Sequence, residues 1–228
     1  SDFSVFRSDK GRAVILGNHG VRIGGTDFDR AVSIDRVMPL LGKGTELRKE
    51  MGVGRSPVPN AIFNDLATWE KIPFLYTAQY RRLANEMARL ACEPEKMDRL
   101  SIVLADELGH ELAFAVERGK IAANAGGAEP GIALDRIEQG LMCALPSSEL
   151  ALILAPLAQK LRVGAQETLQ IAGLNPAHVK RVIYVGGSSL MSVVSETMKT
   201  QFPDAQHAFS EVFTAVADGL AIASGRTE

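Results

Sequence analysis

The chain has 228 residues, of which 46% are hydrophobic and 23% charged, enough to bury the core of one large domain or two small ones. Its net charge of −2 and its scattered Lys and Arg residues provide no general attraction for nucleic acid or acidic lipid. We therefore expect neither a nucleic-acid partner nor a membrane partner.

The two cysteines, Cys92 and Cys143, lack the paired spacing of a zinc site or a redox motif. We expect both to be buried free thiols in a reducing compartment rather than a disulfide. No charged-then-apolar leader opens the sequence, and the longest apolar run, residues 150–158, contains a proline and is about half a membrane span. These features predict a soluble cytoplasmic protein, and the strand-like start is typical of a truncated chain.

The first predicted elements are a hairpin and a helix. Residues 2–8 and 12–16 are strand-like runs joined by a turn that contains glycine. In the segment GGTDFD, residues 24–29, Thr26 stands at an N-cap position and Asp29 completes a capping box. Apolar residues then follow with helical spacing at Phe28, Ala31, Ile34, Val37, Met38 and Leu41.

The middle of the chain predicts a loop followed by a helical block. Residues 42–59 are rich in Gly, Pro and charge, which indicates a mobile surface loop. Residues 60–70, 73–92 and 100–124 each predict a helix. The weak alternation between residues 131 and 145 favours one or two edge strands.

The last third predicts two helices around a strand and a final helix. Residues 147–172 carry an apolar stripe, and Gly173 stands where a C-cap belongs. Residues 182–185 form an apolar run of strand length. A Gly-Gly turn follows this run, and then a predicted helix over residues 189–200. Segment 213–224 predicts a helix whose small residues permit close packing on a sheet.

Three segments are candidates for ligand binding. After the strand, Gly186 and Gly187 allow a ligand to approach the backbone, and the following helix start offers amides to phosphate. The segment lacks the Lys of a P-loop and the third glycine of a dinucleotide fingerprint, so tight-turn packing and ligand contact both remain open. In ERGK, Glu117 and Lys120 share one helix face, where a solvated ion pair is the simplest interpretation.

The other candidates have simpler explanations. A capped helix start accounts for GGTDFD without a ligand. His110-Glu111 lacks the second His four residues after the first, so a zinc-protease helix is not indicated and we expect no metal site.

The order of GGTDFD, ERGK, IYVGGSS and the final segment AVADGLAIAS resembles the seventy-kilodalton heat-shock chaperones, the DnaK-like family. The resemblance is strongest over residues 21–34, 114–124 and 181–225. Residues 42–100 are more similar to the divergent YegD-type branch. The resemblance implies an α/β fold, the C-terminal lobe of an actin-like, ribonuclease H-like ATPase domain with a mixed sheet flanked by helices.

The resemblance also implies a division of the lobe. Residues 1–23 and 146–228 would form its sheet-based base, and residues 24–145 an inserted, mostly helical cap. The first lobe, both phosphate loops and the catalytic Lys are missing from this sequence. The chain is therefore expected to be inactive alone, since catalysis of phosphoryl transfer depends on positioning by both lobes.

ATP or ADP is the cofactor that the resemblance implies, with magnesium expected only in the full-length protein. Asp2 matches an acidic residue past the phosphate glycines, a possible cation or water position. Gly25 would lie near the ribose, and Asn124 stands where the family has a Ser that touches adenine. The positions that match nucleotide contacts are Gly24, Gly25, Glu117, Lys120, Ile121, Asn124, Gly186, Gly187, Ser188 and Leu190.

Three positions depart from the family pattern. Ile121 and Leu190 replace the two Arg residues that sandwich adenine, which removes cation–π terms of about 1 kcal/mol each. Phe213 replaces an Asp. The implied function is a nucleotide-binding lobe of a stress chaperone whose partners would be the first lobe and possibly clients or co-chaperones. The alternatives are a degenerate pseudo-ATPase lobe that docks proteins and a lobe of another actin-superfamily phosphotransferase.

Overall fold

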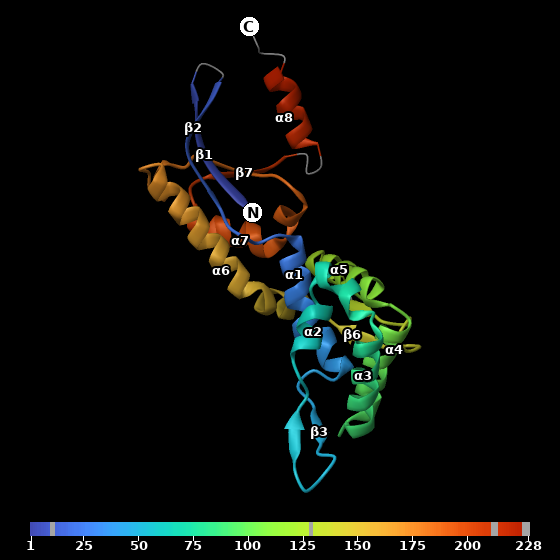
Figure 1. The fold of residues 1–228 in the computed structure, drawn as a ribbon. Coiled ribbons are helices and arrows are strands. Elements are labelled where there is room, and N and C mark those ends of the chain that lie inside the picture. The colour runs from blue at the N-terminus through green and yellow to red at the C-terminus, as the bar shows by residue number, and fades with distance from the viewer. Residues whose placement is uncertain (10–11, 128–129, 211–213, 225–228) are drawn as a thin grey trace. The chain divides into compact units, whose positions relative to one another are not determined.

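The computed structural model describes residues 1–9, 12–127, 130–210 and 214–224. Within these ranges the chain is mixed α/β, as predicted: helices predominate and the strands pair in four two-stranded sheets (Figure 1). The chain divides into two compact units, one formed by Ser1–Gly25 with Leu154–Glu228 and the other by Thr26–Ile153. The base and cap roles that the sequence assigned to residues 1–23 with 146–228 and to residues 24–145 stay a prediction.

The first unit opens with the predicted hairpin. β1 (Asp2–Asp9) and β2 (Arg12–Gly20) pair in antiparallel register, with an irregularity between Val5 and Phe6. Residues 10–11 of the predicted turn lie outside the described ranges. The chain after β2 packs on a helix at Gly164, where an added Cβ would come within 2.3 Å of Val21 Cγ2. Glycine therefore allows this close approach.

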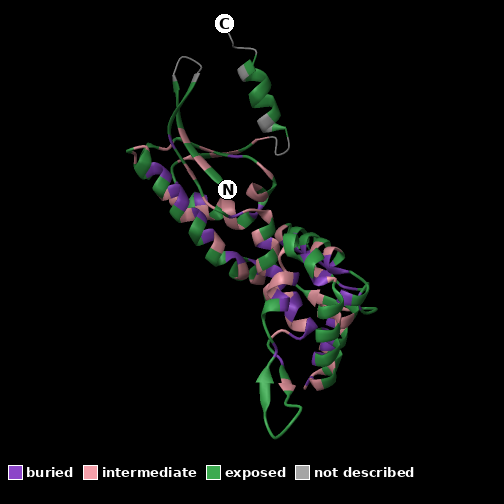
Figure 2. Cartoon of the chain, viewed as in Figure 1, coloured by how far each residue is buried: buried purple, intermediate pink, exposed green. Residues whose placement is uncertain are grey.

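That helix is α6 (Ser147–Ile171), which carries the predicted apolar stripe. Its buried residues recur every three to four positions along one side (Figure 2). Gly173, at φ +66°, ends it as predicted, because the amide of Leu174 donates to the carbonyl of Leu169 at 2.9 Å. The buried apolar side chains are Leu150, Leu154, Ala158, Leu161, Ala165 and Leu169, and Gly164 and Thr168 are buried beside them.

The first unit ends with a parallel strand pair and two helices. The predicted strand is β7 (Arg181–Tyr184), which pairs with β8 (Gln206–Phe209), a strand that the sequence did not reveal. α7 (Ser192–Gln201) connects them, and α8 (Ala215–Ser224) follows. The helix predicted at the end of the chain is confirmed, and every side chain that the structure describes in it is exposed.

The second unit begins with α1 (Gly25–Val32), which continues as a π-helix (Ser33–Val37) and a 3₁₀-helix (Met38–Leu41). The predicted capping box is wrong, because α1 already begins at Gly25. Thr26 therefore lies inside the first turn, and the carboxylate of Asp29 is paired elsewhere. The expected apolar face is confirmed, since Phe28, Val37, Met38 and Leu41 are buried.

The sequence predicted a loop over all of residues 42–59, but part of this segment forms strands. β3 (Glu46–Arg48) and β4 (Arg55–Pro57) form an antiparallel pair within it. Neither three-residue strand has a buried residue, so no apolar alternation marks them in the sequence.

The helical block contains more breaks than predicted. The helix expected over residues 100–124 is two helices, α4 (Pro94–Ala105) and α5 (Gly109–Asn124), because Glu107 adopts φ +57° between them. The hydroxyl of Tyr76 holds this break: it donates to the carbonyl of Glu107 and accepts from the amide of Gly109, each at 3.0 Å. The helices are α2 (Ala61–Leu66), a 3₁₀-helix (Trp69–Leu75), α3 (Ala78–Leu90), α4 (Pro94–Ala105) and α5 (Gly109–Asn124).

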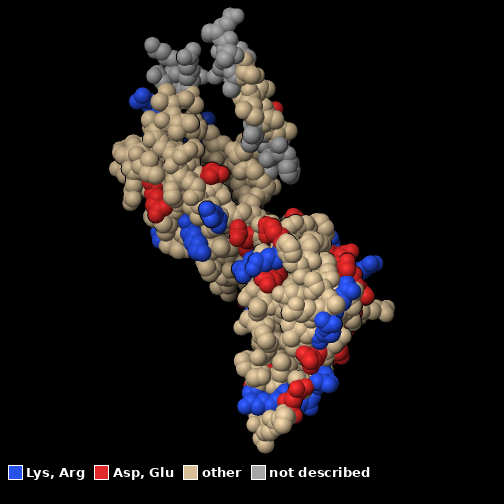
Figure 3. All heavy atoms as spheres, in the orientation of Figure 1, with Lys and Arg blue, Asp and Glu red and all other residues tan. Residues whose placement is uncertain are grey.

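β5 (Gly131–Ala133) and β6 (Met142–Ala144) pair in antiparallel register, which confirms the predicted edge strands. Cys92 and Cys143 are free, as expected, but each is only half-buried. No helix in the described ranges has the length and apolar character needed to cross a membrane. On the face in Figure 3, acidic and basic side chains of the second unit are interspersed.

Candidate functional site

The turn after β7 presents open backbone. Gly186 adopts φ +87°, a left-handed conformation that favours glycine, and its carbonyl accepts from the amide of Ser189 at 3.0 Å. The amides of Gly187 and Ser188, by contrast, donate to no acceptor in the described part of the chain. A Cβ added at Gly187 would meet nothing within 4 Å. The turn therefore offers two amide donors to a ligand such as a phosphate oxygen.

The start of α1 lies beside this turn. A Cβ added at Gly25 would lie 3.3 Å from Oγ of Ser188, and both residues belong to the first unit. Two of the three segments that the sequence singled out are thus brought together, although they stand at opposite ends of the chain.

The third segment, on α5, is paired differently from its simplest interpretation. Lys120 forms an ion pair not with Glu117 but with Asp29 of α1, at 2.7 Å between Nζ and Oδ1. The Lys120 side chain is 7% exposed and that of Asp29 21%. Burial raises the pKa of Asp29 above its usual value; Lys120 opposes this rise, and the charge of Glu117 adds to it. Glu117 is itself exposed, so its carboxylate is accessible to a ligand.

Each unit therefore contains one contact between segments that the sequence singled out. Gly25 lies against Ser188 in the first unit, and Asp29 pairs with Lys120 in the second. The sequence predicted Asp29 only as a capping residue, and its pairing with Lys120 has no local signal because it depends on the packing of α1 on α5.

Gly119 places the charged face of α5. A Cβ added there would lie 2.6 Å from Cγ1 of Ile132 and 3.0 Å from the carbonyl oxygen of Gly131. The absence of a side chain lets α5 pack directly on β5. This contact fixes how Glu117 and Lys120 are oriented.

The remaining predicted positions are partly accessible. Ile121 and Leu190, at the two expected stacking positions, are 55% and 50% exposed. Asn124 and Gly24 are half-buried. Asp2 is exposed, with its carboxylate next to Gly20 at the end of the hairpin. Phe213 lies outside the described residues.

Tyr184 supports the strand that leads into the Gly186 turn. Tyr184 is 5% exposed, and its ring stacks on that of Phe209 with centroids 4.5 Å apart. Its hydroxyl lies 2.7 Å from Nδ1 of His207. Burial raises the pKa of Tyr184 to about 12.

This raised pKa predicts an alkaline loss of stability. A group whose pKa is higher in the folded state stabilises the protein fully below its unfolded value and loses that contribution as the pH rises through the folded value. Between pH 10 and pH 12 the wild-type chain should lose about 2 kcal/mol of unfolding free energy that Tyr184→Phe does not lose. Urea unfolding of both chains between pH 10 and pH 12 measures this loss. If the unfolding free energies of the two chains changed equally with pH, the prediction would be contradicted.

Two candidate ligand-contact regions result, one in each unit: the residues 186–188 turn with Gly25 in the first, and the Glu117–Lys120 face of α5 with Asp29 in the second. The first offers backbone amides and the exposed Leu190, and the second offers an exposed carboxylate, a buried ion pair and the exposed Ile121. These groups suit positioning and binding rather than nucleophilic chemistry. No protein-family model matches the chain.

Proposed function

We propose that the chain is a nucleotide-binding lobe of a DnaK-like chaperone ATPase domain and that its ligand is ATP or ADP. The observation that supports the proposal is one contact within each unit: Gly25 lies against Ser188 in the first, and Asp29 pairs with Lys120 in the second. These contacts involve three of the four segments whose order in the sequence resembles that family.

In this proposal each group has a role that suits its chemistry. The amides of Gly187 and Ser188 donate to anionic oxygen, and Gly25 leaves room beside them. Glu117 accepts hydrogen bonds from ribose hydroxyls. The ammonium group of Lys120 is already paired with Asp29, so it can donate fewer hydrogen bonds to the nucleoside than an unpaired Lys could.

The base would meet apolar rather than cationic side chains. Ile121 and Leu190 expose apolar surface at the two positions where the family has Arg. Packing of adenine on such surface is favourable but lacks the cation–π term. We therefore expect affinity for nucleotide in the micromolar to millimolar range rather than tighter.

The wider assignment follows from the same proposal. The chain would be the second lobe of an actin-like fold, magnesium and hydrolysis would require the first lobe, and clients or co-chaperones would be further partners. Closure of two lobes around ATP and their relaxation after hydrolysis would be the conformational cycle.

Calorimetry with ATP, ADP and adenosine tests the proposal, with one substitution in each unit. Glu117→Gln removes an acceptor and should weaken ATP and adenosine alike, by roughly tenfold. Gly187→Asp places a carboxylate in open space beside the free amides and should weaken ATP far more than adenosine.

Matched controls keep this test specific. Glu86→Gln on α3 and Gly219→Asp on α8 change the same charges at exposed positions and should leave the affinity for ATP unchanged. Equal losses in controls and test variants would contradict the assigned roles.

A docking role without nucleotide is the second candidate. The exposed apolar side chains of Ile121 and Leu190 favour it, because such residues are also typical of protein interfaces. Absence of any heat at millimolar ATP and ADP would support docking and reject nucleotide binding.

A further inference from the structure

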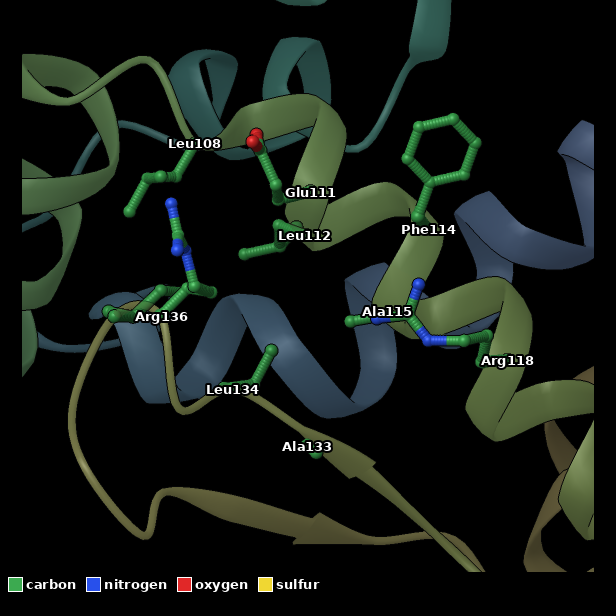
Figure 4. Close-up of a pocket in the computed structure, with 10 residues that line it drawn as sticks. Leu108, Glu111, Leu112, Phe114, Ala115, Arg118, Ala133, Leu134 and Arg136 are labelled. Carbon is green, nitrogen blue, oxygen red and sulfur yellow. The ribbon is translucent and has the colours of Figure 1, made fainter.

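The second unit contains a hollow of about 160 Å³ between one side of α5 and residues 133–137 (Figure 4). Its apolar lining includes Leu112, Leu134 and Ile137, which are buried at 2%, 3% and 7% exposure. This lining belongs to well-packed core residues, so the hollow is formed without a ligand.

The hollow lies on a different side of α5 from the proposed nucleotide contacts. Leu108, Leu112, Ala115 and Arg118 follow one another at helical spacing and line it. Glu117 does not line it. A ligand bound here would therefore use groups that the proposed function leaves unassigned.

Two guanidinium groups line the same hollow. Arg118 comes from α5 and Arg136 from the turn after β5, and both side chains are exposed. In the described part of the chain neither forms an ion pair.

The carboxylates next to Arg136 in sequence are engaged elsewhere. Glu138 accepts two hydrogen bonds from Arg99, at 2.5 and 3.2 Å, and Asp135 accepts one from the amide of Gly140 at 3.1 Å. The remaining carboxylate of the lining is Glu111, so positive charge exceeds negative charge around the hollow.

We propose that this hollow binds a small amphipathic carboxylate. Its apolar body packs on Leu112, Leu134 and Ile137, and its carboxylate is held by one of the two guanidinium groups, Arg118 or Arg136, which lie on opposite sides of Leu112 and Leu134 (Figure 4). Guanidinium groups match a planar carboxylate geometrically, and burial of the ligand's hydrocarbon supplies the larger part of the affinity. Glu111 disfavours a second negative charge, so monoanions are preferred to dianions.

Hexanoate, hexan-1-ol and hexylamine are suitable probes because they share one apolar body and differ in charge. In a methyl-labelled chain, hexanoate should shift the methyl resonances of Leu112, Leu134 and Ile137 saturably at millimolar concentration. Hexan-1-ol should bind at least fivefold more weakly, and hexylamine more weakly still. The titration contains no nucleotide, so its outcome is independent of ATP binding.

Substitution of the arginines completes the test. The double variant Arg118→Gln, Arg136→Gln should raise the Kd for hexanoate at least tenfold and leave that for hexan-1-ol unchanged. Arg82→Gln, at an exposed position of α3, is the matched control and should have no effect. Equal affinity for the acid and the alcohol, an unchanged Kd in the double variant, or no saturable shift of these methyls would each overturn the proposal.

Discussion

Lys120→Met is expected to lower the free energy of unfolding of the second unit by about 3 kcal/mol. The substitution leaves the carboxylate of Asp29, only 21% exposed, without its partner at 2.7 Å. Removing one member of a buried pair costs more than removing both, because an uncompensated charge remains. The double variant Asp29→Asn, Lys120→Met should therefore recover most of the loss in urea unfolding experiments.

The loss in Lys120→Met should also depend on pH. Burial already raises the pKa of Asp29, and loss of Lys120 raises it further, because Lys120 is the group that lowers it. The folded state then binds more protons than the unfolded state, so stability falls as the pH rises through the folded-state pKa. The deficit of this variant should be smaller near pH 4 than at pH 7.

Lys71→Met provides the control for this pair. Lys71 lies 2.7 Å from Asp65, but its side chain is 58% exposed. Its removal should cost less than about 1 kcal/mol. Similar losses for Lys71→Met and Lys120→Met would show that burial does not set the cost at Asp29.

Gly119→Ala is expected to destabilise the second unit by about 2 kcal/mol. The new methyl group would lie 2.6 Å from Ile132 and 3.0 Å from the backbone of β5, so helix and strand must separate. This strain outweighs the gain in helix propensity, which is at most about 1 kcal/mol. Thermal or urea unfolding measures the net effect.

Gly219→Ala is the matched substitution for Gly119. It lies in α8, and an added Cβ there meets nothing within 4 Å. Helix propensity then acts alone, so stability should rise slightly or stay the same. A stabilising Gly119→Ala would mean that α5 does not rest on β5 as closely as the structure shows.

The elements that the sequence predicted correctly carry strong local signals. The β1–β2 hairpin has alternating strands, α6 has a long apolar stripe, and Gly173 terminates it. Neither β3 nor β8 has a buried residue, so neither shows apolar alternation in the sequence. The break before α5 depends on a positive φ at Glu107, and Glu rarely adopts a positive φ, so the sequence does not predict it. Their positions are set by pairing and packing rather than by local propensity.

The residues of the candidate site were likewise predictable from the sequence only where they carry a local signal. Its segments were found from glycine turns and from the order of motifs, but the contact of Gly25 with Ser188 joins opposite ends of the chain. Asp29 is the clearest example of a residue whose contacts cannot be predicted from local sequence. Its spacing from Thr26 fits a capping box, whereas the pairing with Lys120 arises only from the packing of α1 on α5. Periodicity contains no information on such long-range contacts.

A titration of the isotope-labelled chain with ATP, followed by NMR at residues of both units, tests the central claim most directly. One nucleotide bound by both segments should shift the amides of Gly187 and Ser188 and those of Glu117 and Ile121 with a single shared Kd. Saturable shifts confined to one of these segments, or none in either at millimolar ATP, would contradict the account.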